Sequence, residues 1–213
     1  MAYSVGGKNA NLGELRNMLD MPVPRGFSIT IRACSYFLLR TPGLFKNLFR
    51  LLKSIDPEKP ARIAEISQSI EQLVQEAPIP AEVEQALFAE WDAAFGKNAD
   101  VVVALRSSAI AEDGVQTFAG QYRSILGVTR QDLLSAFKKV VASLFSPRAL
   151  TYRAEHGYDL DATGMGLCCV EMVRAKAAGV AFSRHPVDLR SNATVINGLW
   201  GLGEMVVDGS GTP

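Results

Sequence analysis

Two glycines and a lysine stand together near the start of the chain, in the stretch VGGKNANLGEL. Lys8 follows Gly6 and Gly7 and comes just before a predicted helix. Glycines let a backbone approach a ligand closely, a helix N-terminus presents N–H groups, and a lysine adds a point charge. The trio therefore suits phosphate oxygens, and a plain turn with a solvated lysine is the alternative. It is not a Walker A loop, because Ala2 and Asn9 stand where that motif has Gly and Ser or Thr.

A second cation follows a run of five apolar residues, 101–105, which predicts a buried β-strand. Arg106 stands at the predicted end of this strand. An arginine delivered by a buried strand is costly unless it meets an anion, and its planar guanidinium matches phosphate or carboxylate. The sequence therefore leaves two partners open for Arg106: a bound phosphate, or a structural ion pair with Glu112 or Asp113.

The residues after Arg106 have the composition of a ligand-binding loop. Ser107 and Ser108 are expected either to donate to phosphates or to satisfy backbone groups at the end of the strand. Farther on, the stretch TFAGQY predicts a mobile loop around Gly120, which brings backbone N–H groups over a phosphate.

The overall composition is that of an ordinary globular protein with no global charge. The chain has 213 residues, 48% of them hydrophobic and 21% charged, and its 22 basic residues balance its 22 acidic ones. This length is enough to bury a core. A zero net charge provides no overall field toward nucleic acid or an anionic membrane, so a phosphate site has to be local.

Targeting segments and metal or disulfide frameworks are not evident in the sequence. No apolar run approaches the roughly 20 residues of a membrane span, and the first residues lack a hydrophobic signal region, so we expect the cytoplasm. Cys34, Cys168 and Cys169 are odd in number, and two are adjacent within an apolar run, which favours reduced, packed thiols. The absence of a CxxC pair or a His/Cys cluster argues against a zinc site.

Periodicity divides the chain into two parts. Residues 1–98 are predicted to form a mostly helical lobe with the Gly-Gly-Lys loop, and helical spacing is seen in ANLGELRNML, GLFKNLFRLLKSI, ARIAEISQSIEQLVQEA and AEVEQALFAEWDAAF. GFSIT predicts one short strand in this lobe, and Thr30 is expected to cap the helix that follows. The amphipathic stripes are interpreted as core.

Residues 99–213 are predicted to be rich in β-strands. After the strand at 101–105 come a strand in QYRSILGV and helices in RQDLLSAFKKVVASLF and SPRALTYRAEHG. Three strand-like runs follow in GLCCVEMV, AGVAFS and ATVINGLWGLGEMVV, and their short links favour antiparallel hairpins. The predicted fold class is α+β.

Seven of these stretches occur in an order that resembles a known family. They are VGGKNANLGEL, MPVPRGFSIT, ALRSSAIAED, TFAGQYRSILGV, SLFSPRALTYR, VEMV and LWGLGEMVVDG. Together they resemble the N-terminal nucleotide-binding domain of phosphoenolpyruvate synthases, in a wider group with pyruvate phosphate dikinases and rifampicin phosphotransferases. The sequences Ser-Ser-Ala and Phe-Ala-Gly-Gln in these stretches are more similar to the synthase branch than to the dikinase branch.

The resemblance implies an ATP-grasp-like fold of two lobes, with ATP between them and Mg²⁺ as the accompanying ion. It implies that Lys8 and Arg106 contact the phosphates and neutralise charge during catalysis. The remaining implied nucleotide contacts are the lid loop, the strand lining the adenine pocket and the GLGE motif, with residues Thr117, Gly120, Gln121, Glu171, Met172, Val173 and Glu204. Without the resemblance, Met172 would be interpreted as core and Glu204 as a solvated charge.

The chain departs from the family pattern in several places. Val170 stands where the family commonly has Gln, and the loop EDGVQT is shorter than usual, which affects pocket polarity and lid length. The family's acidic metal ligand is expected beyond Pro213. His156 and His185 do not match the family's phosphohistidine, and are interpreted as a helix C-terminal residue and a turn residue.

These observations lead to one function hypothesis and two alternatives. The chain is expected to be most of the ATP-binding domain of a phosphoenolpyruvate synthase-like phosphotransferase. In the complete enzyme, phosphate passes from ATP to a histidine of a separate domain and then to pyruvate, so this fragment alone is expected to be inactive. The alternatives are the corresponding domain of a rifampicin phosphotransferase-like enzyme and a stand-alone nucleotide-binding module. Uncovered strand edges also predict self-association.

Overall fold

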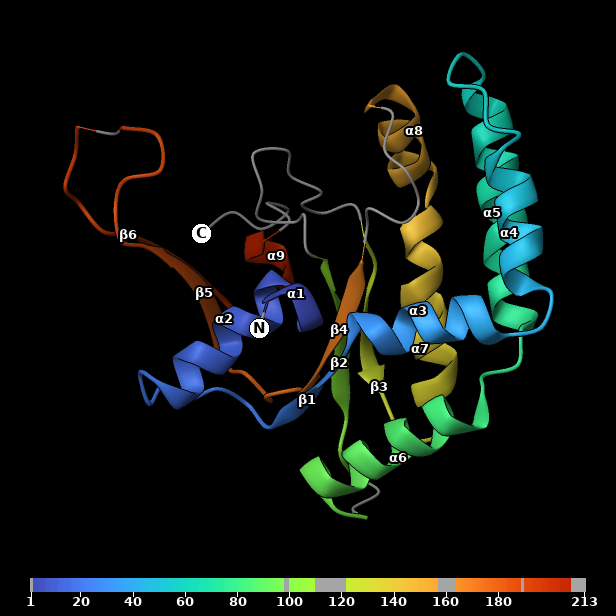
Figure 1. The fold of residues 1–213 in the computed structure, drawn as a ribbon. Coiled ribbons are helices and arrows are strands. Elements are labelled where there is room, and N and C mark those ends of the chain that lie inside the picture. Colours follow the sequence, from blue (N-terminus) through green and yellow to red (C-terminus); the bar gives the residue numbers. More distant parts are fainter. Residues whose placement is uncertain (1, 98–99, 110–121, 157–163, 189, 208–213) are drawn as a thin grey trace. The chain divides into compact units, whose positions relative to one another are not determined.

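The computed structural model describes residues 2–97, 100–109, 122–156, 164–188 and 190–207 (Figure 1). The chain divides into two compact units, Met1–Met172 and Val173–Pro213. This boundary differs from the division expected near residue 98. A strand that precedes residue 98 pairs with one that follows it, so the predicted helical and β-rich parts share a single sheet in the first unit.

The first unit is built on a four-stranded antiparallel sheet with the strand order β1-β4-β2-β3. Its strands are β1 (Gly26–Ile29), β2 (Val103–Ala109), β3 (Ser124–Val128) and β4 (Met165–Glu171). The four strands confirm the corresponding sequence predictions. However, β2 begins two residues later than expected and continues to Ala109, so Arg106 lies in the middle of the strand and not at its end.

Helices make up most of the rest of the first unit. They are α1 (Ala2–Val5), α2 (Gly7–Asn17), α3 (Ile31–Arg40), α4 (Leu44–Leu52), α5 (Pro60–Glu76), α6 (Ala81–Phe95), α7 (Leu133–Ala142), the short 3-10 helix η2 (Ser143–Phe145) and α8 (Pro147–His156). Thr30 caps α3 as predicted, because its side chain accepts a hydrogen bond of 3.2 Å from the backbone N–H of Ala33.

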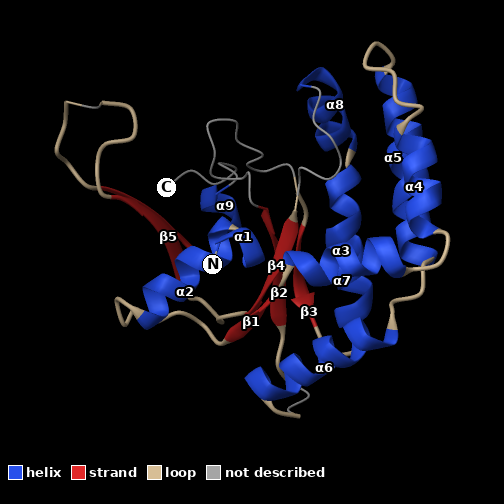
Figure 2. Cartoon of the chain, viewed as in Figure 1, coloured by secondary structure: helices blue, strands red, loops and turns tan. Residues whose placement is uncertain are grey.

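The two faces of the sheet have different environments (Figure 2). One face packs against α3, α6 and α7, where the apolar stripes of the helices meet side chains such as Leu105 and Leu167. Trp91, Phe37 and Phe137 are fully buried in this core. On the other face, α2 contacts β2 and β4. The predicted apolar stripes therefore form the hydrophobic core on one face of the sheet, and α2 lies on the other face.

The second unit contains a hairpin and a short helix. β5 (Ala177–Phe182) and β6 (Val195–Trp200) pair antiparallel, as the sequence predicts. Two other expectations are wrong. β4 and β5 do not form a hairpin, since β4 pairs with β1 and β2 in the first unit. The end of the last strand-like run is helical, as α9 (Glu204–Val207), because Gly201 turns the chain with a φ of 90°.

The three cysteines are free and buried, as expected. Within the described ranges, no helix is both long enough and apolar enough to cross a membrane.

Candidate functional site

The N-terminus of α2 is seated against β2 and β4 by close backbone contacts. Gly6 adopts φ 83° and ψ 164°, and a Cβ there would lie 1.9 Å from the carbonyl oxygen of Ser108. On the facing strand, a Cβ on Gly166 would lie 2.6 Å from the carbonyl oxygen of Val5. Glycine is therefore required at both positions, and Lys8 lies in the first turn of α2, not in a loop before the helix.

Asn9 connects α2 to both strands through hydrogen bonds. Its backbone N–H donates to Oγ of Ser108 at 3.2 Å, and its Nδ2 donates to the carbonyl oxygens of Val5 at 2.9 Å and Leu167 at 3.0 Å. The side chain is buried, with 5% of its surface exposed. The residue next to Lys8 is thus held by β2, β4 and α1 together.

Arg106 belongs to a row of four residues that crosses the whole sheet. In the register of the strands, Ser28 is opposite Cys168, Cys168 is opposite Arg106, and Arg106 is opposite Ser124. Cross-strand partners project from the same face of a sheet. Ser108 is two residues from Arg106 and faces α2, so the row lies on the α2 face.

The thiol of Cys168 is within electrostatic reach of both Lys8 and Arg106. Burial raises the pKa of Cys168 to about 11, while the positive charges of Arg106 and Lys8 act in the opposite direction. Two residues far apart in the sequence therefore place their charges around one position on the α2 face. The N-terminus of α2 adds the partial positive charge of a helix dipole. This arrangement suits an anion with several negatively charged oxygens.

The side chain of Arg106 is exposed, although the strand around it is buried. The burial cost expected for its cation is therefore absent, because alternation along the strand turns Arg106 out toward the α2 face. In the described part of the chain, no hydrogen bond or ion pair engages its guanidinium. Glu112 and Asp113, the alternative ion-pair partners, lie outside the described residues.

The two serines after Arg106 do not have the exposure of phosphate donors. Ser107 is 2% exposed and, by alternation, projects from the opposite face to Arg106. Ser108 is fully buried, and its Oγ accepts the hydrogen bond from Asn9. Of the two interpretations open for these serines, the structural one is supported.

Glu171 lies three residues after Cys168 on β4, so alternation turns its side chain to the face that packs against α3, α6 and α7. There it forms an ion pair with Arg25 through two hydrogen bonds. Nε of Arg25 lies 2.8 Å from Oε2 of Glu171, and Nη2 lies 2.9 Å from Oε1. The hydrogen bond from Arg25 lowers the pKa of Glu171 below its ordinary value. The backbone N–H of Glu171 also donates to the carbonyl oxygen of Arg25 at 2.8 Å. The side chain of Glu171 is thus engaged with the connector before β1.

Met172 ends the first unit and contacts two neighbouring strands. Its backbone N–H donates to the carbonyl oxygen of Val102 at 2.9 Å, and its Sδ accepts from the N–H of Gly127 at 3.1 Å. Val173 and Glu204 belong to the second unit, where both are exposed. The lid residues Thr117, Gly120 and Gln121 lie outside the described residues. Of the predicted set, Lys8 and Arg106 are the two described residues whose charges act on one group, the thiol of Cys168.

A hollow of about 120 Å³ lies between α2 and the β1–β4 edge, next to the row of four residues. It is lined by Cys168, Ser28, Asn9 and Arg16, and by Val170, which stands where the family commonly has Gln. Cys168 and Asn9 were not predicted as site residues. A buried thiol and an amide that binds backbone carbonyls leave no local pattern in a sequence, although the position of Asn9 beside Lys8 was a hint.

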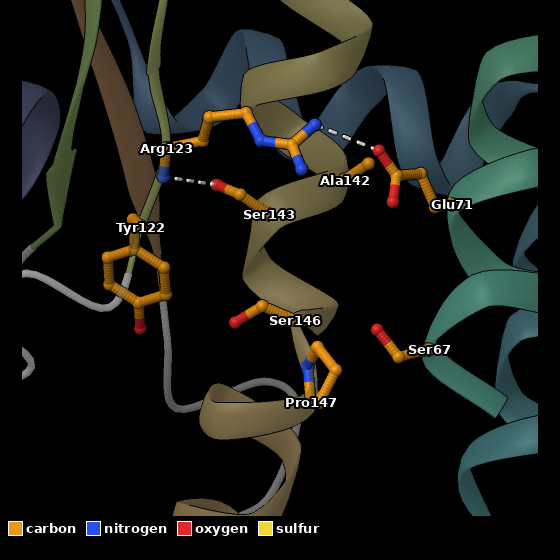
Figure 3. A pocket seen from close by; sticks show the side chains of 8 residues that line it. All are labelled: Ser67, Glu71, Tyr122, Arg123, Ala142, Ser143, Ser146 and Pro147. Carbon is orange, nitrogen blue, oxygen red and sulfur yellow. Dashed lines mark hydrogen bonds and ion pairs between the residues drawn. The ribbon is translucent and has the colours of Figure 1, made fainter. Parts of the chain in front are cut away.

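A second hollow, of about 310 Å³, lies elsewhere in the first unit (Figure 3). Its polar side chains are largely engaged with the protein itself. Arg123 pairs with Glu71 at 2.9 Å, Oγ of Ser143 accepts from the N–H of Arg123, and Oγ of Ser67 donates to the carbonyl oxygen of Phe145. None of the predicted site residues lines this hollow.

The histidines have the structural roles expected from the sequence. His156 is the last residue of α8, and its Nδ1 lies 2.8 Å from the carbonyl oxygen of Tyr152. Nδ1 of His185 accepts from the backbone N–H of Asp188 at 2.8 Å, within a turn. Among the described residues, no group of three or more His, Cys, Asp or Glu side chains is placed to hold a metal ion.

Comparison with known proteins gives a consistent family. Residues 2–213 match the family model described as "Pyruvate phosphate dikinase, AMP/ATP-binding domain". A "Probable phosphoenolpyruvate synthase" of Staphylothermus marinus is 40% identical over 98% of the chain and 26% of that protein. One of Methanothermobacter thermautotrophicus is 37% identical over 98% of the chain and 31% of that protein. A "Rifampicin phosphotransferase" of Bacillus cereus is 34% identical over 97% of the chain and 24% of that protein. The chain spans less than a third of each of these relatives.

Proposed function

Because the chain belongs to the pyruvate phosphate dikinase AMP/ATP-binding domain family, we propose that it is the ATP-binding part of a phosphoenolpyruvate synthase-like phosphotransferase. In the complete protein, a phosphoryl group of ATP is transferred to a histidine of a separate domain and from there to pyruvate. The role of the present chain in this sequence is to bind ATP and to orient its phosphates.

The observation that supports this proposal is that the charges of Lys8 and Arg106 both act on the thiol of Cys168. Phosphoryl transfer depends mainly on positioning and on neutralising the charge of the phosphate oxygens. A helix N-terminus, an ammonium group and a guanidinium group at one place supply these functions. The guanidinium has a planar set of donors for two oxygens, whereas the ammonium group acts as a compact point charge.

The rest of the nucleotide site follows from the family resemblance. We assign an ATP-grasp-like architecture in which Thr117, Gly120 and Gln121 cover the phosphates. The backbone near Met172 and Val173 reads the adenine edge, and Glu204 contacts the nucleotide. Glu171 is proposed to contact the adenine through its backbone, since its side chain is paired with Arg25.

Magnesium accompanies ATP in this proposal, but the described residues do not fit a metal centre, as no cluster of suitable ligands is present among them. ATP binding by this chain is therefore expected to persist when Mg²⁺ is chelated.

Calorimetric titration with ATP, ADP, AMP and adenosine tests the proposal. We expect affinity to fall as phosphates are removed, by about tenfold or more for each charge-assisted contact that is lost. Inorganic triphosphate serves as a control for binding that depends on charge alone. Equal affinity for ATP and adenosine, or a folded chain that binds none of the four, would contradict the assignment of a phosphate site.

A rifampicin phosphotransferase-like enzyme is the second candidate, because a relative with that name matches almost the whole chain. The higher identities to proteins named as phosphoenolpyruvate synthases favour the first candidate. The acceptor distinguishes the two candidates. The complete protein is expected to consume ATP when pyruvate is added as the acceptor, and not when rifampicin is added.

A further inference from the structure

Asn9 is held in one orientation by groups of a single kind. Both partners of its side chain are backbone carbonyls, of Val5 and Leu167, and carbonyls only accept hydrogen bonds. Nδ2 therefore has to face them, and the alternative amide orientation would place Oδ1 against two acceptors. Oδ1 itself has no hydrogen-bond partner among the described residues. The buried amide thus uses both N–H donors of Nδ2, whereas its acceptor Oδ1 is unused within the described residues.

The contacts of Asn9 reach both strands that shape the phosphate site. Leu167 is adjacent to Cys168 on β4, and Ser108 is two residues from Arg106 on β2. Asn9 is adjacent to Lys8 on α2. The hydrogen bond to Ser108 thus joins the backbone next to Lys8 to the strand that carries Arg106, and the bond to Leu167 joins α2 to the neighbouring strand β4. The close packing of Gly6 on Ser108 limits how near the start of α2 can come to β2, whereas the hydrogen bonds of Asn9 hold it against β2 and β4.

We propose that Asn9 is a positioning residue that sets the spacing between Lys8 and Arg106, so that both cations engage the phosphates of one nucleotide. The proposal rests on the proposed function, since it assumes a bound nucleotide. Asn9 does not touch the nucleotide in this account. It acts through Lys8, and its effect is confined to the part of the affinity that comes from the phosphates.

A double-mutant cycle between Asn9 and Lys8 tests this role. The chain is titrated calorimetrically with ATP and with adenosine, as the unaltered protein, Asn9→Ala, Lys8→Met and the double variant. We expect Asn9→Ala to weaken ATP binding by about fivefold and to leave adenosine binding unchanged. Lys8→Met is expected to cost about tenfold in the unaltered chain but about threefold or less in the Asn9→Ala background.

Two further variants guard against a merely structural effect. Ser67→Ala removes a buried hydrogen bond to the carbonyl oxygen of Phe145, in the hollow drawn in Figure 3, and is expected to leave ATP binding unchanged. Ser108→Ala removes the acceptor of the Asn9 backbone N–H and retains both Nδ2 bonds. It is expected to show the same dependence on Lys8, with a smaller loss, and it replaces Asn9→Ala in the cycle if that variant does not fold.

The outcomes separate the two proposals. Additive effects of Asn9 and Lys8, or equal losses for ATP and adenosine, overturn the positioning role and leave the proposed function standing, provided that Lys8→Met weakens ATP binding. A folded, unaltered chain that does not bind ATP overturns both. A cycle in which Lys8 loses most of its contribution without Asn9 supports both.

Discussion

At the scale of single residues, the environment of Cys168 reports on the two cations beside it. Burial disfavours the thiolate, and the charges of Arg106 and Lys8 partly offset this effect. Because the pKa of Cys168 is raised to about 11, its thiol is protonated at neutral pH. A protonated, buried thiol is a poor nucleophile.

The first prediction concerns the reactivity of this thiol. Alkylation of Cys168 by iodoacetamide is expected to be slow at neutral pH and to accelerate only as the pH rises toward its raised pKa. Arg106→Ala and Lys8→Met each remove a charge that favours the thiolate, so each is expected to shift the profile to higher pH. Peptide mass spectrometry after alkylation measures the extent at each cysteine, with Cys34 as a buried control. A profile that is insensitive to both variants would contradict the placement of the two cations.

At the scale of elements, the seat of α2 depends on a backbone conformation that only glycine tolerates. Gly6 lies in the region of positive φ and extended ψ, and its Cα approaches a carbonyl of β2. Gly13, in the middle of α2, has nothing within 4 Å of the place where a Cβ would lie. Gly6, directly before α2, and Gly13, inside it, therefore differ in what they contribute.

Replacing each of these glycines by alanine should have opposite effects on stability. Gly6→Ala is expected to lower the free energy of unfolding by about 2 kcal/mol or more, because both the conformation and the contact with Ser108 are lost. Gly13→Ala is expected to raise it by about 0.5–1 kcal/mol, because alanine has the higher helix propensity. Urea unfolding followed by circular dichroism measures both, and similar effects at the two positions would be inconsistent with the described seat of α2.

The Arg25–Glu171 pair ties the connector before β1 to the end of β4, and its stability should depend on pH. Since Arg25 lowers the pKa of Glu171 in the folded protein, the pair stabilises the fold above the ordinary pKa of 4.5. This contribution is lost as the pH falls through the lowered value. Arg25 is exposed and Glu171 is half-buried, so solvent screens the pair and the effect is expected to be small.

Glu171→Gln should therefore be less stable than the unaltered chain at neutral pH and equally stable in acid, where the unaltered carboxylate is protonated. Urea midpoints measured over this pH range provide the test. Glu65→Gln is the matched control, because it breaks a local pair with Arg62 within α5 and connects no separate elements. A difference between Glu171→Gln and the unaltered chain that grew toward acid pH would show that the sign is wrong.

The sequence predicted the elements better than their long-range contacts, for physical reasons. The helical stripes of α4–α7 and the cap at Thr30 are local patterns, and all of them are confirmed. The end of β2 was misplaced, because an arginine and two serines interrupt its apolar run although β4 continues to pair with it. The bonds from Asn9 to Leu167 and from Arg25 to Glu171 join residues 158 and 146 positions apart, and no local spacing encodes them.

At the scale of the whole molecule, the two compact units each contain one tryptophan. Trp91 is fully buried in the core of the first unit, whereas Trp200 of the second unit is 86% exposed at the end of β6. Tryptophan fluorescence therefore reports on the two units separately. The two-stranded sheet of the second unit is small for independent stability.

Acrylamide quenching of tryptophan fluorescence should resolve two emitting side chains, one accessible to the quencher and one protected from it. The emission of Trp200 is expected to be quenched readily and that of Trp91 to be protected until the first unit unfolds. The variants Trp91→Phe and Trp200→Phe assign the two components. Two protected tryptophans would mean that the end of β6 is covered in solution. Self-association through strand edges, which the sequence predicted, is tested separately by light scattering over a range of protein concentrations.

Calorimetric titration of the unaltered chain and of Arg106→Ala with ATP is the sharpest test of whether Arg106 and Lys8 form a phosphate site. Arg62→Ala, on the exposed surface of α5, is the matched control for loss of an arginine. We expect Arg106→Ala to weaken ATP binding by about tenfold or more, as for loss of a charge-assisted contact, and Arg62→Ala to bind like the unaltered chain. Equal affinities in all three proteins would show that Arg106 does not bind the phosphates.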